Sequence, residues 1–530
     1  MKQILNGWES IKSMERGAEK LCDCVKLTLG PKGKNVAIER KYTFPLITND
    51  GVTIAKEVEL SDPFENVGAQ VIKEASIRTN DIAGDGTTTA CVLTHAIIKE
   101  GIKNYTAGAN PVILKKGIQK ATSLAVENLK IVSQPVSTNK EIFQVASVSA
   151  GSEEIGEIIA RAFEKVGKDG VITVEEGKTT KTELKIVEGM QFDRGYLSPY
   201  MCTNMEKMIA QLTNPLILVT DAKINNINEI LHLLEPLSSS GRSLLIIADD
   251  IETEVLSTLV LNKLRGMLNI VCVKAPAYGD RRTATLMDIC ALTGSTFVSK
   301  EVGNNLREIT LENLGSASSI VITKDSTTIT GGSGMQTEIN ARIEAIKAQI
   351  TDDLSDFDRD KLQERLAKLT GGVGVIVVGA ATEIEMQEKK LRIEDAISAT
   401  KSAVAEGIVA GGGVALISTL PALDELINTL NGDEKTGAQI VRKALVQPLI
   451  TIANNAGMDG SVVLNNVLQG ISLSPTYGYD ALNNTYTDML QAGIIDPTRV
   501  TRSALENASS VASTLLTTEC IICECENKNA

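Results

Sequence analysis

The order in which helical and strand-like periodicity follow one another limits the folds open to this chain. Apolar residues recur at helical spacing within residues 8–133 and again after Gly413. Between these segments, residues 171–190 and 214–330 alternate short apolar blocks, typical of strands, with amphipathic helical stretches. Such alternation is typical of an α/β domain. The sequence therefore predicts a multidomain α and α/β chain in which one domain is inserted into another.

Chain length also favours several domains. The chain has 530 residues and a mass of 56.6 kDa, and a single core seldom organises more than about 250–300 residues, so roughly three domains are expected. Apolar residues make up 43% and charged residues 22% of the sequence, as in soluble globular proteins rather than disordered ones. No apolar run reaches the ~18 residues of a membrane helix.

Composition excludes several functions. Residues Met1–Asn6 show neither a long apolar segment nor an Arg-rich stretch, so no signal or transit peptide is expected. A net charge of −13 and only 3% aromatic residues are a poor match to nucleic-acid binding, which needs basic surface and stacking platforms. His95 and His232 are the only histidines, so histidine-based catalysis has few candidates.

The cysteines indicate a reducing compartment. Nine are scattered along the chain, and an odd, dispersed set fits free thiols better than a disulfide framework. Cys520, Cys523 and Cys525 form one cluster near the C-terminus. A metal site is one interpretation, but no fourth ligand is nearby, and a final strand with small buried thiols is favoured.

Local patterns predict individual elements. A helix over residues 8–29 should stop at Gly30-Pro31. Between Val36 and Leu60, short β-type runs are broken by Asn49-Asp50-Gly51, which predicts the turn of a hairpin. Further helices are predicted over residues 65–79, 88–107, 111–133 and 382–406.

The stretch Gly84–Thr89, followed by an apolar helix, is the clearest chemical signal. Glycines allow close approach of the backbone to a ligand, and a helix N-terminus offers free N–H groups to phosphate. Asp85 is a suitable Mg²⁺ ligand. An ordinary capped helix after a polar turn explains the same residues equally well. No Walker A pattern occurs in the chain, so a P-loop ATPase is disfavoured.

Five separated motifs together resemble one family. In chain order they are Thr28-Leu29-Gly30-Pro31-Lys32-Gly33, Gly84–Thr89, Gly279-Asp280-Arg281-Arg282, Arg392-Ile393-Glu394-Asp395-Ala396 and Ala410-Gly411-Gly412-Gly413. They closely resemble the signatures of the group I chaperonins, the GroEL-type 60-kDa family. The resemblance extends from about residue 15 to about residue 524.

The resemblance implies three domains. Residues 1–133 and 407–530 would form a mostly helical equatorial domain that binds ATP and makes ring contacts. Residues 134–187 and 372–406 would form a small intermediate hinge domain. Residues 188–371 would form an α/β apical domain that binds non-native protein.

The resemblance also implies site residues and the cofactors ATP, Mg²⁺ and K⁺. Asp85 would hold Mg²⁺, whereas Asp50 and Asp395 would orient the attacking water, Asp395 after swinging down onto bound nucleotide. Without the resemblance, Asp50 is a turn aspartate and Asp395 belongs to a solvated helix face. The residues matching phosphate, ribose and adenine contacts are Thr28, Leu29, Gly30, Pro31, Asp85, Gly86, Thr87, Thr88, Thr89, Gly412, Asp480 and Asp496.

A second set resembles the family's groove for clients and the co-chaperonin lid. Leu231 with Leu234, and Leu256 with Val260, have helical spacing, so each pair shares one helix face. The residues alone favour core packing, and only the resemblance implies exposed faces. The full set is Tyr196, Tyr200, Met201, Leu231, Leu234, Leu256, Val260 and Leu261.

Three residues depart from the family pattern. Pro236 should end or kink the first groove helix, and Ser238–Gly241 should complete the break. Asp480 stands where asparagine is commoner, and an ionised aspartate cannot donate a hydrogen bond to adenine. Ile450 replaces an arginine used between rings, which leaves one ring or two as alternatives.

The predicted function is ATP-driven protein folding in a ring cavity. The implied partners are further copies in seven-membered rings, two of them stacked, a GroES-type co-chaperonin and unfolded clients, with no nucleic acid or membrane. One rival is a ring-forming holdase or scaffold that turns ATP over poorly; another is a metabolic kinase, for which the sequence shows no small-molecule acid/base site. A bacterial cytoplasm and a plastid stroma are both compatible with the sequence.

Overall fold

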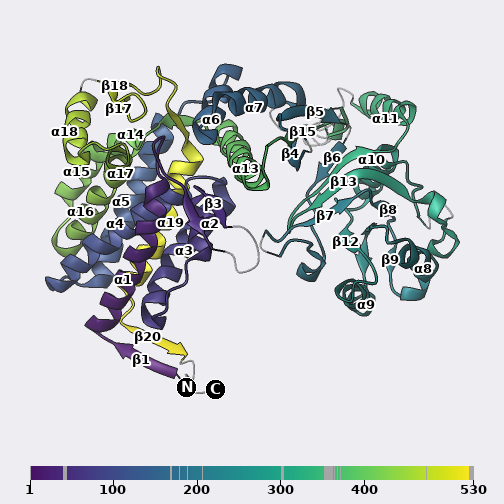
Figure 1. Ribbon diagram of the computed structural model, residues 1–530, viewed down its shortest axis with the longest axis horizontal. Helices are drawn as coiled ribbons and strands as arrows, with labels where there is room; N and C mark the ends of the chain where they lie inside the picture. Colours follow the sequence, from purple (N-terminus) through teal and green to yellow (C-terminus); the bar gives the residue numbers. More distant parts are fainter. Residues whose placement is uncertain are drawn as a thin grey trace. The chain divides into compact units, whose positions relative to one another are not determined.

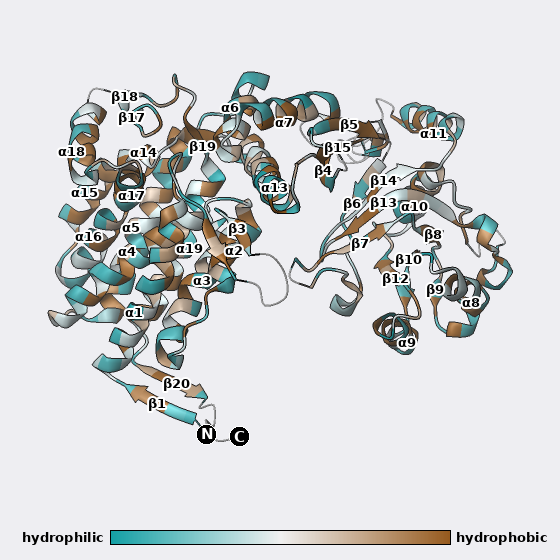
Figure 2. Cartoon of the chain, in the orientation of Figure 1, coloured by the Kyte–Doolittle hydropathy of each residue, from teal (hydrophilic) through white to brown (hydrophobic). Residues whose placement is uncertain are grey.

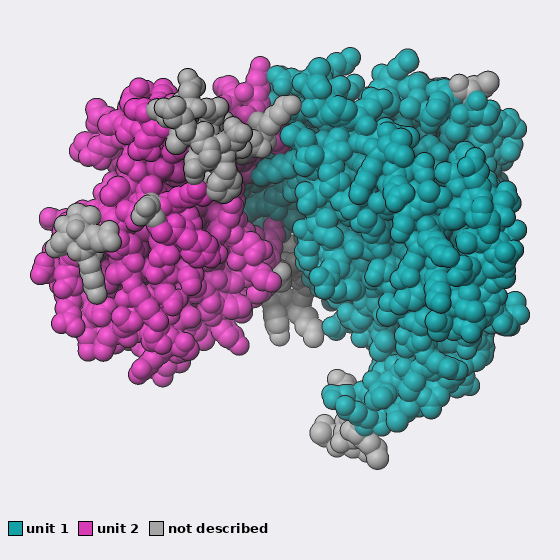
Figure 3. Space-filling model, turned by 180° about the vertical axis from the view of Figure 1, so that it is seen from behind, with its two compact units in different colours: residues 1–161, 174–183, 377–530 teal, residues 162–173, 184–376 magenta. Residues whose placement is uncertain are grey.

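The computed structural model describes residues 2–39, 45–167, 170–177, 179–187, 189–205, 207–299, 304–350, 362, 365–366, 368–370, 372–472 and 474–524. The chain forms two compact units (Figures 1 and 3). One comprises residues 1–161, 174–183 and 377–530, and the other residues 162–173 and 184–376. The first unit thus draws on both ends of the chain, as an inserted domain requires. The finer division into three domains stays a prediction.

The first unit is mostly helical, and the predicted helices are present with shifted ends. Their amphipathic sequences place apolar residues on one side, as α1 shows (Figure 2). The helices are α1 (Trp8–Val25), α2 (Gly51–Glu57), α3 (Pro63–Ala83), α4 (Thr87–Thr106), α5 (Pro111–Val132), α6 (Asn139–Ala150), α7 (Glu153–Val166), α13 (Glu383–Glu406), α14 (Val414–Ser418), α15 (Leu420–Thr429), α16 (Gly432–Ala444), α17 (Gln447–Asn455), α18 (Gly460–Ile471) and α19 (Thr498–Leu516). Residues 162–166 of α7 belong to the second unit.

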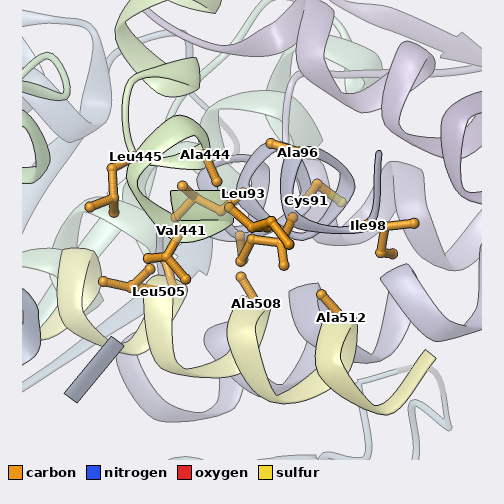
Figure 4. Close-up of a cluster of buried hydrophobic side chains, with 14 of the residues drawn as sticks. Cys91, Leu93, Ala96, Ile98, Val441, Ala444, Leu445, Leu505, Ala508 and Ala512 are labelled. Carbon is orange, nitrogen blue, oxygen red and sulfur yellow. The ribbon is translucent and has the colours of Figure 1, made fainter. Parts of the chain in front are cut away.

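The core of this unit lies where α4, α16 and α19 meet (Figure 4). Small side chains on α19, including Ala508 and Ala512, let α4 approach closely. Leu93 of α4 fills the space between the two helices. Elsewhere glycine does the same: a β-carbon at Gly17 of α1 would lie 1.7 Å from the carbonyl oxygen of Glu65 in α3. These close packings fix the helices that carry the candidate site.

The two chain ends pair with each other. Strand β1 (Lys2–Asn6) lies antiparallel to β20 (Cys520–Glu524), which confirms the predicted C-terminal strand. Cys523 is buried and Cys520 is exposed, whereas Cys525 lies outside the described residues. Within the described part of the chain, no three His, Cys, Asp or Glu side chains are grouped to hold a metal ion.

The hairpin near residue 40 differs from the prediction. Strands β2 (Val36–Ile38) and β3 (Leu46–Thr48) pair antiparallel, so the hairpin exists. Asn49-Asp50-Gly51 is not its turn, however, because Asp50 caps α2 by accepting hydrogen bonds from the N–H groups of Val52 and Thr53. An Asn-Asp-Gly sequence suits a turn and a helix N-cap equally.

The second unit is α/β. Its main sheet has the order β12-β10-β8-β13-β14-β6, with β7 beside β13. Strands β8, β10 and β12 are parallel and almost entirely buried, as apolar runs predict. The bounds are β6 (Gly189–Phe192), β7 (Ala210–Thr213), β8 (Leu216–Val219), β10 (Leu244–Ala248), β12 (Ile270–Lys274), β13 (Gly315–Ile322) and β14 (Thr327–Gly332), with helices α8 (Leu231–Ser240), α9 (Thr253–Leu264), α10 (Asp280–Thr293) and α11 (Gln336–Gln349).

Short strands complete the described structure. They form the ladders β16–β19, β17–β18, β9–β11 and β4–β15–β5. Helices long and apolar enough to span a membrane are absent from the described residues. The bounds are β4 (Val171–Glu176), β5 (Glu183–Val187), β9 (Lys223–Ile224), β11 (Asp250–Ile251), β15 (Val373–Val378), β16 (Ile408–Ala410), β17 (Tyr477–Asp480), β18 (Thr485–Asp488) and β19 (Ile495–Pro497).

Candidate nucleotide-binding site

The turn between α3 and α4 presents an open helix N-terminus. Gly84 and Gly86 have φ values of 70° and 78°, a left-handed conformation that favours glycine. Gly86 occupies the N-cap position of α4 and brings no side chain to cap it. The first N–H groups of α4, from Thr87 onward, are therefore the kind of donors that bind an anion at a helix N-terminus.

The loop after α1 lies beside this turn. A 3₁₀ turn over Lys26–Thr28 follows α1, and the Thr28 hydroxyl lies 2.9 Å from the carbonyl oxygen of Val25 and 3.2 Å from the hydroxyl of Thr88. Gly30 has a φ of 86°. The structure thus brings Thr28, the first of the predicted loop residues, next to Thr88 at the start of α4.

Asp50 approaches the same turn through its neighbour Gly51. A β-carbon at Gly51 would lie 2.4 Å from the hydroxyl oxygen of Thr88 and 2.8 Å from that of Thr87. Only glycine fits there, so the N-terminus of α2 can reach the threonines. Gly51 could not be singled out from the sequence, because the threonines that it contacts belong to another helix.

Three carboxylates share this site. The Asp85 carboxylate accepts hydrogen bonds from the N–H of Gly86 and, at 2.9 Å, from the Ser149 hydroxyl. Burial raises the pKa of Asp85, and the nearby charge of Asp50 adds to the shift. Burial also raises the pKa of Asp496 to about 7, with a further contribution from Asp85. Asp85 thus repels both Asp50 and Asp496, and a divalent cation at Asp85 would relieve this repulsion, since carboxylate oxygens are suitable ligands for it.

Helix α13, which carries Asp395, contacts the turn between α3 and α4. The Ser402 hydroxyl donates a hydrogen bond of 3.0 Å to the carbonyl oxygen of Ala83. Ser398, one turn after Asp395, packs so closely on Gly84 that a β-carbon there would lie 2.2 Å from the Ser398 Cβ. Asp395 is half-buried on this helix, so a solvated helix face does not describe it.

Gly412 and Asp496 are brought together by the β16–β19 ladder. Val409 pairs with Asp496, and the N–H of Gly411 donates to the carbonyl oxygen of Ile494 at 2.9 Å. Gly412 follows with a φ of 65°. This ladder places the two residues on adjoining backbone segments although they are far apart in sequence.

Asp480 is engaged within its own hairpin. Its carboxylate accepts hydrogen bonds from the N–H groups of Leu482 and Asn483 and from the Asn483 side chain, at 2.8 to 3.2 Å. These bonds shape the loop between β17 and β18. The carboxylate thus has a structural role that the sequence did not reveal, and adenine contact by Asp480 stays a prediction.

A family comparison covers the whole of this architecture. The model of the TCP-1/cpn60 chaperonin family matches residues 21–525. This chain is a member of that family. Its multidomain α and α/β fold is that of the GroEL-like chaperonins. Membership implies ATP-dependent assistance of protein folding, and family members are ATPases.

The predicted client groove of this chaperonin is only partly exposed. Tyr200, Leu231 and Leu261 are 58%, 40% and 47% exposed, and Leu256 and Val260 are half-buried beside the core. The expected exposure is wrong for Tyr196, Met201 and Leu234, which lie in the core of the α/β unit. Helical spacing places Leu231 and Leu234 near each other, but it does not say which of them faces the sheet.

Pro236 lies inside α8 and does not end it. The helix continues through Ser240 and stops at Gly241, whose φ is 67°. The predicted break over Ser238–Gly241 is therefore wrong except at its last residue. Proline removes one backbone donor, but the apolar residues Leu233 and Leu237 anchor the helix to the core on either side.

Several site residues were missed because they meet their partners only in space. Ser149 donates to Asp85, and Ser398 packs on Gly84. The Asn455 side chain donates to the carbonyl oxygens of Lys26 and Leu29, at 2.9 Å each, and so holds the loop over Thr28–Pro31. In the sequence, these three residues are ordinary helix-surface polar positions.

Proposed function

We propose that this chain is a group I chaperonin subunit that hydrolyses ATP to fold enclosed client proteins. The observation that carries the proposal is the meeting of Asp50, Asp85 and Asp496 at the uncapped N-terminus of α4. Backbone donors suit the phosphates, and the half-buried carboxylates of Asp85 and Asp496, whose pKa values are raised, would be stabilised in their charged form by a cation. Mg²⁺ at Asp85, with K⁺ nearby, would neutralise phosphate charge when bound.

Asp395 supplies the hydrolytic group in this proposal. Its helix already contacts the phosphate turn through Ser398 and Ser402. With Asp50 on the opposite element, the Asp395 carboxylate accepts a hydrogen bond from a water molecule and orients it toward the terminal phosphate. Asp85 instead contributes to the binding of ATP with Mg²⁺. The division of roles between Asp85 and Asp395 is the testable core of the mechanism.

The assembly belongs to the same proposal. Seven subunits form a ring, two rings stack, and a GroES-type co-chaperonin closes the cavity over the client. Clients bind the exposed apolar side chains of Tyr200, Leu231 and Leu261. The buried thiols Cys22, Cys91 and Cys272, whose pKa values burial raises, suit a reducing compartment such as a bacterial cytoplasm or plastid stroma.

Asp395→Ala and Asp85→Ala test the roles directly. We expect Asp395→Ala to slow ATP turnover by roughly 10²–10⁴ with ATP affinity nearly unchanged, as for loss of a positioned catalytic group. Asp85→Ala should lose Mg²⁺-dependent ATP binding. Equal affinity losses in both variants would overturn the division of roles.

Refolding assays decide between a folding machine and a holdase. Wild type should release active client in an ATP- and lid-dependent manner, whereas Asp395→Ala should capture client and release it slowly. Capture by wild type with no ATP-dependent release would favour the holdase instead. Native mass spectrometry of the same samples gives the number of subunits and rings.

A further inference from the structure

A cavity lies in the helical unit, apart from the predicted nucleotide residues. It has a volume of about 690 Å³, is open to solvent on one side, and is lined by residues of α1, α4, α15, α16, α17 and α18. Small-molecule sites usually have volumes of about 300–1,000 Å³. None of the predicted nucleotide-binding residues lines it. Its size is therefore within the range of small-molecule sites.

The lining combines apolar and polar side chains. Val92, Ala96 and Leu464 are among the apolar side chains, and Gln447 and Thr451 supply hydrogen-bonding groups. Apolar walls can bind the body of a small organic molecule, and polar groups can orient it. The lining alone does not fix the ligand's charge.

The charges around the cavity favour an anion. One carboxylate, Glu100, lines it together with five cationic side chains: Lys26, Lys99, Lys103, Arg442 and Lys443. Glu100 pairs with both Lys103 and Lys443. The other cations pair with Asp23, Glu19 and Asp424, which do not line the cavity. The lining itself therefore carries five cations and one carboxylate. Exposed pairs of this kind contribute at most about 1 kcal/mol each, so a ligand anion can replace a protein partner.

His95 provides an independent sign of a missing partner. Its Nε2 atom is buried and has no hydrogen-bond partner among the described residues. Burial, with Lys99 nearby, lowers the pKa of His95 to about 4, so the ring is neutral at pH 7. Buried polar atoms are rarely left without a partner. A polar ligand atom in the cavity would satisfy this nitrogen.

We propose that this cavity binds a small organic anion with an apolar body, such as a medium-chain carboxylate. The apolar chain packs between α4 and α18, and the carboxylate lies at the positive rim near Lys103 and Lys443. The arrangement follows from the lining and from the excess positive charge. It requires nothing from the nucleotide site.

The cavity is also linked to the nucleotide loop. Asn455 lines the cavity and donates hydrogen bonds of 2.9 Å to the carbonyl oxygens of Lys26 and Leu29. A ligand in contact with Asn455 would favour one arrangement of the loop over Thr28–Pro31. If that loop binds ATP, as proposed above, the anion and ATP change each other's affinity by the same factor. The cavity is then an effector site.

Calorimetric titration of the nucleotide-free protein with octanoate tests binding. We expect one octanoate per chain, and no binding of octylamine, which has the same chain length and the opposite charge. Lys443→Glu should weaken octanoate binding by at least about 10-fold, and His95→Phe by about 3- to 10-fold. Lys120→Glu is the matched control, because Lys120 also pairs with a glutamate at 2.7 Å but lies outside the cavity. The affinity of this variant for octanoate should change less than 2-fold.

Three results would overturn the binding proposal. They are no stoichiometric octanoate binding, equal binding of octylamine, and equal losses in Lys443→Glu and Lys120→Glu. Ile450 also lines the cavity. If a second copy of the chain covers the cavity there, octanoate will not bind the intact assembly, and the proposal is overturned. Thermal melts of the variants show whether each is folded.

ATP affinity with and without saturating octanoate tests the link. We expect a change of about 3- to 10-fold in wild type and Lys120→Glu, and none in Lys443→Glu at the same octanoate concentration. Octanoate binding without any change in ATP affinity would overturn the link and leave the anion site standing. Absence of ATP binding would instead overturn the proposed function, independently of the octanoate result.

Discussion

Gly84 and Ser398 are packed so closely that a β-carbon on the glycine would lie 2.2 Å from the serine Cβ. The contact joins the turn between α3 and α4 to α13, at a position one helical turn after Asp395. Two elements that are remote in sequence are thus held in a fixed relation at the candidate site. Any side chain at position 84 must displace α13 or distort the turn.

Gly84→Ala should therefore impair catalysis more than folding. The φ of 70° is unfavourable for alanine and the Ser398 contact adds a clash, so we expect ATP turnover to fall at least about 10-fold and stability by roughly 1–3 kcal/mol. Gly108→Ala is the matched control, since Gly108 has a φ of 97° and nothing near its β-position. Equal losses of turnover in both variants would contradict the role of the contact.

Asp496 should make stability depend on pH. Its pKa, raised by burial to about 7 from a reference of 3.8, means that the folded chain holds a proton between these pH values while the unfolded chain has lost it. Stability contributed by Asp496 is thus present at low pH and is lost as pH rises toward 7. Asp496→Asn should gain stability over wild type above pH 7, by the order of 1–3 kcal/mol because the side chain is only half-buried.

Asp488 provides a control of opposite sign. A hydrogen bond from Thr476 lowers the pKa of Asp488, so its contribution is present at neutral pH and is lost as pH falls. Asp488→Asn should therefore lose stability at neutral pH and converge on wild type in acid. Urea unfolding of both variants at pH 4, 6 and 8, without nucleotide, measures the two trends. If the stability differences of the two variants from wild type changed with pH in the same direction, the opposite pKa shifts of Asp496 and Asp488 would be contradicted.

Periodicity predicted the fold because burial acts on whole elements. The apolar blocks Leu216–Val219 and Leu244–Ala248 became buried parallel strands, and residues 382–406 became α13. Patterns of short range were less reliable. Asn49-Asp50-Gly51 has the composition of a hairpin turn, but Asp50 caps a helix instead, since both structures use the same side-chain oxygens.

The candidate site was predictable only where its residues form motifs. Gly84–Thr89 and Asp395 lie in motifs that resemble the chaperonin family, whereas Ser149 and Asn455 are single polar residues whose partners are remote in sequence. The sequence also failed to predict which side chains of the client groove are exposed. Leu234 and Leu231 have the same apolar character, and only the position of the sheet decides that Leu234 is buried.

Leu234→Ser and Leu261→Ser should separate stability from client binding. Leu234 is 5% exposed and Leu261 is 47% exposed. We expect Leu234→Ser to cost several kcal/mol, about 2–5, as for truncation of a core leucine, and Leu261→Ser to cost less than about 1 kcal/mol while weakening client capture. Thermal melts and capture assays on the same samples measure both. A stable Leu234→Ser variant that fails to capture client would restore the original groove prediction.

Asp288 should be among the most sensitive charged residues of the α/β unit. Its side chain is 1% exposed and accepts hydrogen bonds from Arg342 at 2.6 Å and from Nε and Nη2 of Arg365 at 2.9 and 3.1 Å. Asp288→Asn leaves two partly buried guanidinium groups without their counter-charge, so we expect a loss of about 3–5 kcal/mol. Asp424→Asn removes the partner of Arg442 at an exposed site, where both side chains are more than 40% exposed, and should cost less than about 1 kcal/mol. Chemical unfolding followed by circular dichroism compares the two, and similar small losses would show that Asp288 is not a structural anchor of this unit.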